Sequence, residues 1–327
     1  MKRKMAPEDV FPEVLKRLLG EVSNSLHRIV PVSGRERRSK FINFEGGGVE
    51  QQFNRHLLLH HCANYAAALS IFISEKSGRR ILELGCGSGL LSSAFARLLP
   101  EGYSLLATDY SSQMIEYARS IWQKQSGSAL RFECLNARDI SANLLKEFDG
   151  VMFLEVLEHL LPEDATSLLY RLHHGLKPGG IVVISTLDRS PFKRPFSGYI
   201  HHRVEYSYEK LRDFLSSHEN NPFATFQVYR LVSPEITKKA VHSENWGGYL
   251  FNRLVGILEM MSRRNSGLEV TKKRVANLFY RFFNPLSSKM GSYPLSCLED
   301  IQFVTTEPES YNQNSFSLIA VLKKATE

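Results

Sequence analysis

Three glycines at alternate positions follow a short apolar run that has the pattern of a buried strand. They are Gly85, Gly87 and Gly89. Glycine lets a backbone approach a ligand where a Cβ atom would clash. The next apolar run begins at Tyr103 and ends in Asp109, which puts a carboxylate at the tip of a second strand. A glycine turn beside such an acid is typical of a nucleotide-like cofactor site, in which the acid accepts hydrogen bonds from two ribose hydroxyls.

The spacing of the glycines separates two cofactor classes. In the dinucleotide fingerprint Gly-x-Gly-x-x-Gly, the third glycine would stand where this chain has Leu90. The segment after Asp109 reads Tyr-Ser-Ser-Gln-Met-Ile-Glu-Tyr-Ala-Arg. Together these motifs resemble the class I S-adenosylmethionine-dependent methyltransferases, whose first motif is Glu/Asp-x-Gly-x-Gly-x-Gly. The resemblance implies S-adenosylmethionine as cofactor, and a dinucleotide enzyme is the rival interpretation.

The resemblance also predicts which residues contact the cofactor. Glu83 holds the place of the motif acid, near the cationic methionine end. Asn136 stands where the family often has an acid that accepts a bond from the adenine amino group. An amide oxygen can accept the same bond, although Asn136 could instead close a turn. The predicted cofactor-binding residues are Glu83, Gly85, Cys86, Gly87, Gly89, Asp109, Tyr110, Met114, Asn136, Ala137 and Leu154.

A second group of residues that could bind a metal or take part in catalysis follows the predicted strand 150–154. If the chain is helical after that strand, Glu155, Glu158 and His159 lie on one helix face. Two carboxylates and one imidazole suit a divalent cation, so Mg²⁺ or another divalent ion is a candidate second cofactor. The same three residues are the predicted catalytic residues. Without a metal, His159 would be the general base.

Two families that the chain resembles use a Glu-x-x-Glu-His pattern for metal. The closer likeness is to the ubiquinone-biosynthesis O-methyltransferases, which act on catechol-like polyprenyl phenols. The weaker likeness is to the small-RNA 3′-terminal 2′-O-methyltransferases, in which a downstream histidine completes the site. This chain offers His201 and His202 for that role, in a segment like the His-x-x-Glu-Tyr/Trp of the RNA enzymes.

Composition limits the remaining possibilities. The 327 residues are 43% hydrophobic, and the formal net charge is +7. Two basic clusters, 35–40 and 263–283, leave RNA binding and peripheral membrane contact open. The four cysteines have no paired spacing and no run is apolar enough to cross a bilayer, which predicts a cytoplasmic location without a transmembrane segment.

Alternating strand and helix patterns predict an α/β fold: a Rossmann-like, doubly wound, mostly parallel sheet of seven strands. The strands are expected near 80–85, 103–109, 130–135, 150–154, 181–186, 224–231 and 315–322. The helices between them are expected near 89–99, 112–124, 139–147, 163–175 and 207–217. We expect an N-terminal helical extension (1–77), a cofactor-binding core (78–232 plus 313–327) and a helical insertion (233–312) that forms a substrate lid.

Two helices are expected in the insertion, near 245–264 and 269–284, and both carry aromatic stripes. A lid of this kind above the sheet edge favours O-methylation of a small acceptor, lipophilic or aromatic, as the first functional hypothesis. Metal-dependent RNA 2′-O-methylation is the alternative. A non-catalytic S-adenosylmethionine-binding module is the third.

Overall fold

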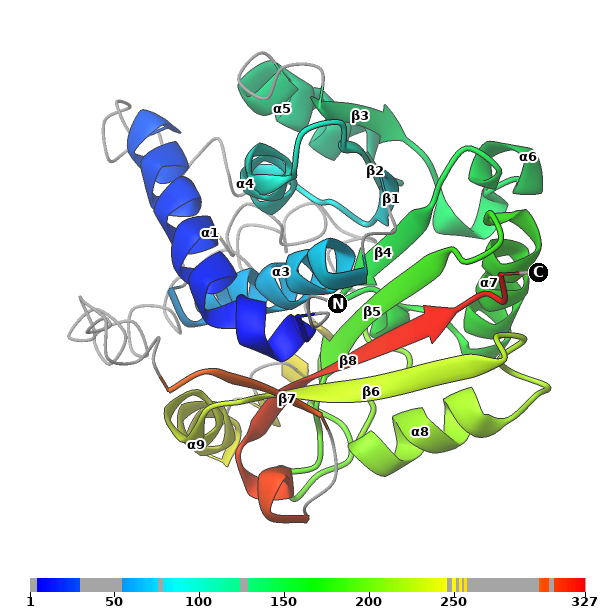
Figure 1. Ribbon diagram of the computed structural model, residues 1–327. Coiled ribbons are helices and arrows are strands. Elements are labelled where there is room, and N and C mark those ends of the chain that lie inside the picture. Colours follow the sequence, from blue (N-terminus) through cyan, green and yellow to red (C-terminus); the bar gives the residue numbers. More distant parts are fainter. Residues whose placement is uncertain are drawn as a thin grey trace.

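One sheet of eight strands organises the part of the chain that the structure describes (Figure 1). The computed structural model describes residues 5–29, 55–75, 79–123, 129–245, 249–250, 253–254, 256–257, 300–305 and 309–326. The strands are β1 (Arg80–Leu84), β2 (Ser104–Asp109), β3 (Leu130–Cys134), β4 (Gly150–Leu154), β5 (Ile181–Leu187), β6 (Thr225–Val232), β7 (Gln302–Thr305) and β8 (Ser315–Lys323). Their order in the sheet is β3-β2-β1-β4-β5-β8-β6-β7.

The sheet is mostly parallel, as the sequence predicted. β1 pairs in parallel with β2 and β4, and β8 runs antiparallel to β5 and β6. The chain moves outward from β1 to β3 and then returns to β4, so the order reverses between β1 and β4. In open α/β sheets, ligands bind at the carboxyl ends of the strands beside such a reversal.

The predicted count of seven strands is wrong. The eighth strand, β7, pairs antiparallel with β6 at the edge of the sheet and comes from the end of the insertion. Its four residues are too few for an alternating pattern to stand out in the sequence. The other strands begin and end within about two residues of the predicted bounds.

Helices cover both faces of the sheet (Figure 1). The first core cluster joins one face to α1, α3, α4 and α5, and the second joins the other face to α6, α7 and α8. The helices are α1 (Pro7–Ile29), α3 (Arg55–Glu75), α4 (Leu90–Leu98), α5 (Ser112–Trp122), α6 (Ala142–Leu145), α7 (Pro162–Gly175), α8 (Tyr208–Ser216) and α9 (Pro234–Ser243). Three short 3₁₀ turns are η4 (Ala137–Asp139), η5 (Leu157–His159) and η7 (Glu309–Gln313).

The N-terminal extension packs onto the core. Its first helix, α1, is amphipathic, and the apolar face buries Phe11 and Leu18. Arg97 of α4 ties it down with a 2.6 Å bond to the Glu21 carboxylate. Beneath α1, helix α3 lies so close to β4 that a Cβ atom on Gly150 would be 2.5 Å from the Phe72 ring. Helix α3 therefore lies between α1 and the middle of the sheet.

The insertion starts with a helix that the sequence analysis did not predict. The Ser233 hydroxyl caps α9 by accepting a bond from the Ile236 N–H, and Pro234 opens its first turn. Ser-Pro-Glu is a typical helix start, so the signal was present. Residues 249–250, 253–254 and 256–257 are helical, within the helix expected at 245–264.

Several features predicted from the sequence have no counterpart among the residues that the structure describes. The helix expected at 269–284 and the basic clusters 35–40 and 263–283 lie outside the described residues. The lid and the three domain boundaries stay predictions. Among the helices that the structure describes, none has the length and apolar character to span a bilayer.

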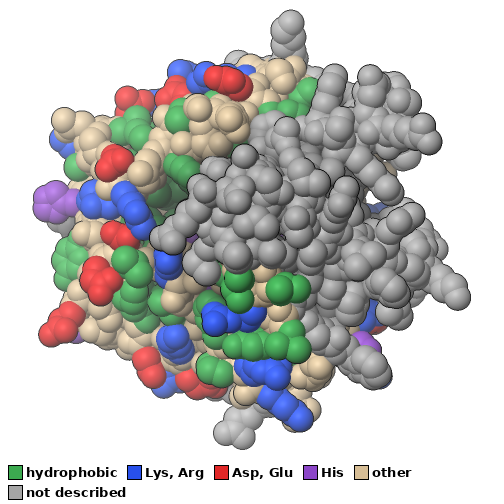
Figure 2. All heavy atoms as spheres, turned by 180° about the vertical axis from the view of Figure 1, so that it is seen from behind, with side chains coloured by type: hydrophobic (Ala, Val, Ile, Leu, Met, Phe, Trp, Pro, Cys, Tyr) green, Lys and Arg blue, Asp and Glu red, His purple; other side chains and the backbone are tan. Residues whose placement is uncertain are grey.

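The described surface has mixed charge on the face turned away from the view of Figure 1. Figure 2 shows Lys and Arg side chains interspersed there with Asp and Glu, with hydrophobic side chains between them. On the described part of this face, the net positive charge is therefore not gathered into one continuous basic stripe of the kind that a nucleic-acid backbone would follow.

Candidate functional site

The glycine loop between β1 and α4 is anchored to its neighbours by backbone hydrogen bonds. The N–H groups of Gly85 and Cys86 both donate to the Thr108 carbonyl at 2.8 Å. The Trp122 indole donates to the Ser88 carbonyl at 2.9 Å. These bonds leave the loop little freedom, so its shape is set before a ligand binds.

Each of the three loop positions requires glycine for a different structural reason. All have positive φ, which favours glycine. A Cβ atom on Gly85 would lie 2.5 Å from a methyl of Val156, and one on Gly89 would lie 2.8 Å from the Ala118 side chain. At Gly87 nothing lies within 4 Å of that position. Gly87 therefore borders open space where a ligand can approach the backbone, whereas the other two permit close packing.

Asp109 lies directly beside that space. Its Oδ2 accepts a 3.0 Å bond from the Gly87 N–H, and its Oδ1 accepts a 2.9 Å bond from the Ser111 N–H. Each carboxylate oxygen keeps lone-pair capacity for another donor. Burial raises the pKa of Asp109, and the two N–H bonds oppose that effect. The remaining acceptor capacity suits a pair of ribose hydroxyls, and this role of Asp109 stays a prediction.

Glu83 lies deeper than the predicted role requires. Its side chain is 1% exposed and accepts a hydrogen bond from the Tyr65 hydroxyl of α3. Burial raises the pKa of Glu83 to about 7, although hydrogen bonds from Tyr65 and Ser92 partly oppose the rise. The carboxylate therefore joins the strand to the overlying helices, and its contact with the cofactor stays a prediction.

The side chains of the remaining predicted cofactor residues differ in their exposure to solvent. Asn136 caps η4 by accepting a 3.0 Å bond from the Arg138 N–H, so the turn-closing alternative describes its observed contact. Tyr110 is 71% exposed, whereas Met114 and Leu154 are buried. Cys86 is buried and Ala137 begins η4. The adenine-binding role of this group stays a prediction.

The helical face predicted for the acidic–histidine group is wrong. Glu155 has φ of +57° and precedes η5, so the chain leaves β4 through a left-handed residue and not through a regular helix. A non-glycine residue in that region stores backbone strain, which is common at functional sites. Among the described residues, Glu155 lies outside the group that brings ligand atoms of Glu158 and His159 together.

Glu155 faces helix α3. Its Oε1 accepts bonds from the Asn64 amide at 3.0 Å and the Ser185 hydroxyl at 3.1 Å, and its Oε2 lies 3.3 Å from His60 Nε2. Burial alone would raise the pKa of Glu155, but the His60 charge and hydrogen bond outweigh it and lower the pKa to about 2. Glu155 is therefore a half-buried carboxylate with hydrogen-bonding or ionic partners on both oxygens.

Glu158 is the second acid and is buried. Its Oε2 accepts a 3.0 Å bond from the Thr186 hydroxyl. Its backbone carbonyl accepts bonds from the N–H groups of Arg203 and Val204, which fastens the loop after β5 to η5. Burial and then the nearby Glu155 charge raise the pKa of Glu158.

Glu158 forms a potential metal-ligand group with two histidines. One ligand atom from each of Glu158, His159 and His202 lies within 4.8 Å of the others. The structure thus gathers two of the three predicted metal residues and adds His202 in place of Glu155. His201 contributes its backbone carbonyl, which lies 3.1 Å from His159 Nδ1.

In both histidines, a contact at Nδ1 fixes the orientation of the imidazole ring. His159 Nδ1 faces that carbonyl, and His202 Nδ1 lies 2.6 Å from Glu205 Oε1. An acceptor at Nδ1 favours the tautomer whose Nε2 carries the lone pair, as in metal-binding histidines. Burial and then His202 lower the pKa of His159 to about 4, so its ring is neutral at pH 7. A donor set of one carboxyl group and two imidazoles fits a divalent transition metal.

Helix α3 contributes polar side chains to the site that were not predicted from the sequence. His60 and Asn64 are four residues apart, so both project from one helix face toward Glu155. The available signal was a set of polar residues in an otherwise apolar helix. Their role depends on the packing of α3 along β4 and β8, which the local sequence does not reveal.

Comparison with known proteins agrees with this geometry. Residues 81–180 match the family model described as a methyltransferase domain. The ubiquinone biosynthesis O-methyltransferase of Xanthomonas axonopodis pv. citri (strain 306) is 36% identical over 117 residues, covering 36% of this chain and 46% of that relative. The enzyme of the same name from Pseudomonas aeruginosa (strain LESB58) is 35% identical over 115 residues, covering 35% and 47%. The chain spans about half the length of these curated relatives.

Among solved structures, a phosphoethanolamine N-methyltransferase 2 of Haemonchus contortus aligns with a TM-score of 0.44 and 17% identity, covering 76% of this chain and 50% of that one. The strand order, the Gly87–Asp109 pairing and the family match together define the class. The chain carries a class I S-adenosylmethionine-dependent methyltransferase domain.

Asp109→Asn should weaken binding of S-adenosylhomocysteine by about 10- to 100-fold, because hydrogen bonds to a charged group are worth about 1.5–3 kcal/mol. Titration calorimetry measures the change. Asp149→Asn is the matched control, since Asp149 also accepts a bond from a backbone N–H, that of Arg80, at the opposite end of the strands. Equal affinities for the two variants would contradict the assignment.

The free energy of unfolding should fall between about pH 5 and pH 8 because of Glu83. Its folded-state pKa is about 7 against 4.5 for the free group, so over this range the unfolded chain releases the proton first and is favoured. Glu83→Gln removes the effect and should gain up to about 3 kcal/mol over the wild type across the range. Urea titrations at several pH values test this, and parallel curves for the two proteins would refute it.

Proposed function

We propose that this protein transfers the methyl group of S-adenosylmethionine to an oxygen atom of a small aromatic or lipophilic acceptor. The observation that carries the proposal is the adjacency of two sites. The Gly87–Asp109 cradle and the Glu158–His159–His202 group lie at neighbouring strand ends, joined by the contact of Val156 with Gly85. The names of the curated relatives support an oxygen acceptor.

The cofactor and the protein would supply different parts of the chemistry. Bound S-adenosylmethionine supplies a methyl group already activated by its sulfonium. Asp109 and the Gly87 backbone hold and orient the cofactor, and the buried strand ends around Glu158 exclude water. A phenol has a pKa of about 10, so it needs only modest help from a base, worth about 10²–10⁴ in rate. His159, neutral at pH 7 with its Nδ1 held, can receive the acceptor's proton at Nε2.

A divalent cation fits the same group of residues. Glu158, His159 and His202 would hold it through one carboxylate oxygen and one ring nitrogen from each histidine, which is Nε2 if the bonds at Nδ1 are kept. Such an ion supplies Lewis-acid polarisation of an acceptor oxygen. In that case His159 acts as a ligand, which suits its lowered pKa better than the role of base.

One observation favours a second candidate, metal-dependent 2′-O-methylation of RNA. His202 joins the metal-ligand group and Glu205 follows three residues later, as in the His-x-x-Glu segment that the sequence shares with the RNA enzymes. A 2′-hydroxyl is much less acidic than a phenol and gains more from a cation. We rank it second because the curated relatives are named for a small-molecule pathway.

Methyl transfer from radiolabelled S-adenosylmethionine tests both candidates. The full chain is incubated with a panel of catechols of increasing alkyl chain length, and separately with single-stranded RNA ending in a 2′-hydroxyl or a 2′-deoxy nucleotide. We expect label in the catechols, abolished by Asp109→Asn. Label only in the 2′-hydroxyl RNA would replace the first candidate by the second, and label in neither substrate would contradict both.

A further inference from the structure

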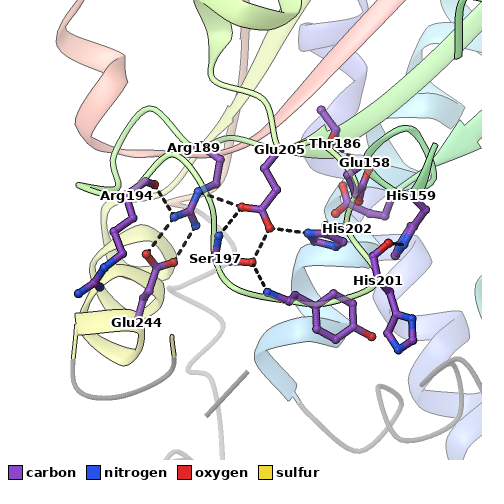
Figure 3. A network of polar contacts seen from close by, with 12 residues as sticks. Glu158, His159, Thr186, Arg189, Arg194, Ser197, His201, His202, Glu205 and Glu244 are labelled. Atoms are coloured by element: carbon purple, nitrogen blue, oxygen red, sulfur yellow. Dashed lines mark hydrogen bonds and ion pairs between the residues drawn. The ribbon is translucent and has the colours of Figure 1, made fainter. Parts of the chain in front are cut away.

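A buried arginine lies beside the metal-ligand group, on the far side of the Glu205 carboxylate (Figure 3). Arg189 follows β5 and is 3% exposed, yet it contacts two acids. Its Nε lies 3.2 Å from Glu205 Oε2, and its two terminal nitrogens donate to Glu244 at 2.7 and 2.9 Å. A guanidinium with this many buried partners is rigid, because each N–H direction is fixed by the planar fork.

Glu205 connects that arginine to the metal-ligand group. Its Oε2 accepts a 2.7 Å bond from the Ser197 N–H, and its Oε1 accepts bonds from the Ser197 hydroxyl and from His202 Nδ1. Figure 3 shows the Glu205 carboxylate between Arg189 on one side and His202 on the other. The side chain is 2% exposed, so its negative charge depends on these partners.

The position of Glu205 determines which ring nitrogen of His202 is available as a metal ligand. A carboxylate at Nδ1 favours the tautomer with the lone pair on Nε2 and raises the ligand basicity of the ring. If Glu205 were neutral or displaced, the ring could rotate or carry its proton on Nε2, and the donor atom would be lost. Arg189 stabilises the ionised form of Glu205 through a charge-assisted contact.

The same arginine joins the site to the insertion. Glu244 is the residue directly after α9, the first helix of the insertion, and its carboxylate pairs with Arg189 in a bidentate arrangement. Arg189 also donates to the Arg194 carbonyl at 2.6 Å, which ties down the loop after β5. The start of the insertion and the loop bearing His202 are thus held by one side chain.

We propose that Arg189 and Glu205 are positioning residues that orient His202 for a divalent transition metal, held with Glu158 and His159. The inference rests on the metal-binding form of the proposed function. Two imidazoles beside one carboxylate favour Mn²⁺, Fe²⁺ or Zn²⁺ over Mg²⁺, which prefers oxygen ligands and keeps several waters.

The test is Mn²⁺ binding to the full chain, measured by electron paramagnetic resonance or calorimetry. Glu205→Gln preserves shape but removes the charge, and loss of an outer-shell partner typically costs 10- to 100-fold in metal affinity. We expect a loss of that size, with S-adenosylhomocysteine affinity within about twofold of wild type. Ser197→Ala, which removes one bond to Glu205, should weaken Mn²⁺ by a smaller factor and serves if Glu205→Gln does not fold.

Two further variants calibrate the measurement. His202→Ala defines the loss of a direct ligand, and Glu235→Gln is the control, since Glu235 pairs with Lys239 on the outside of α9. Wild-type Mn²⁺ affinity in Glu205→Gln, or no saturable Mn²⁺ binding by the unmodified protein, would overturn the inference. Retained Mn²⁺ and S-adenosylhomocysteine binding without methyl transfer would instead refute the proposed function alone.

Discussion

The contact between the glycine loop and the turn after β4 is the constraint on which the rest of the site depends. Gly85 leaves no room for a side chain, since its missing Cβ would fall 2.5 Å from a Val156 methyl. That fit brings the end of β4 directly onto the loop that leaves β1. The cofactor cradle therefore lies against the acidic–histidine group, and the two could not work together if the strands were further apart.

The polar residues behind this contact are satisfied by elements distant in sequence. Asn64 of α3 donates to Glu155 and accepts a 2.7 Å bond from the Ser317 hydroxyl of β8. A buried carboxylate without such partners would be strongly destabilising. Helix α1 in turn packs against α3, and the Arg97–Glu21 pair joins α1 to α4. The N-terminal extension is therefore part of the site and not a separate appendage.

The sequence was most informative where one local pattern had one structural solution. The run ending in Gly85 and the run ending in Asp109 predicted adjacent strand ends. The pairing of β1 with β2 and the bond from the Gly87 N–H to the Asp109 carboxylate bear out that adjacency. It was least informative where tertiary contacts decide. The helical spacing of Glu155 and His159 was overridden by a left-handed residue, and the partnership of His202 with Glu158 depends on a loop bond to the Glu158 carbonyl.

The central claim is that the methyl donor and the acidic–histidine group share one edge of the sheet. A crystal structure with S-adenosylhomocysteine, after soaking in Mn²⁺ and with data collected at the manganese absorption edge, tests it most directly. We predict the ribose hydroxyls on Asp109 and an anomalous peak among Glu158, His159 and His202. Density for the nucleoside away from Asp109, or manganese bound elsewhere with this group empty, would contradict the account.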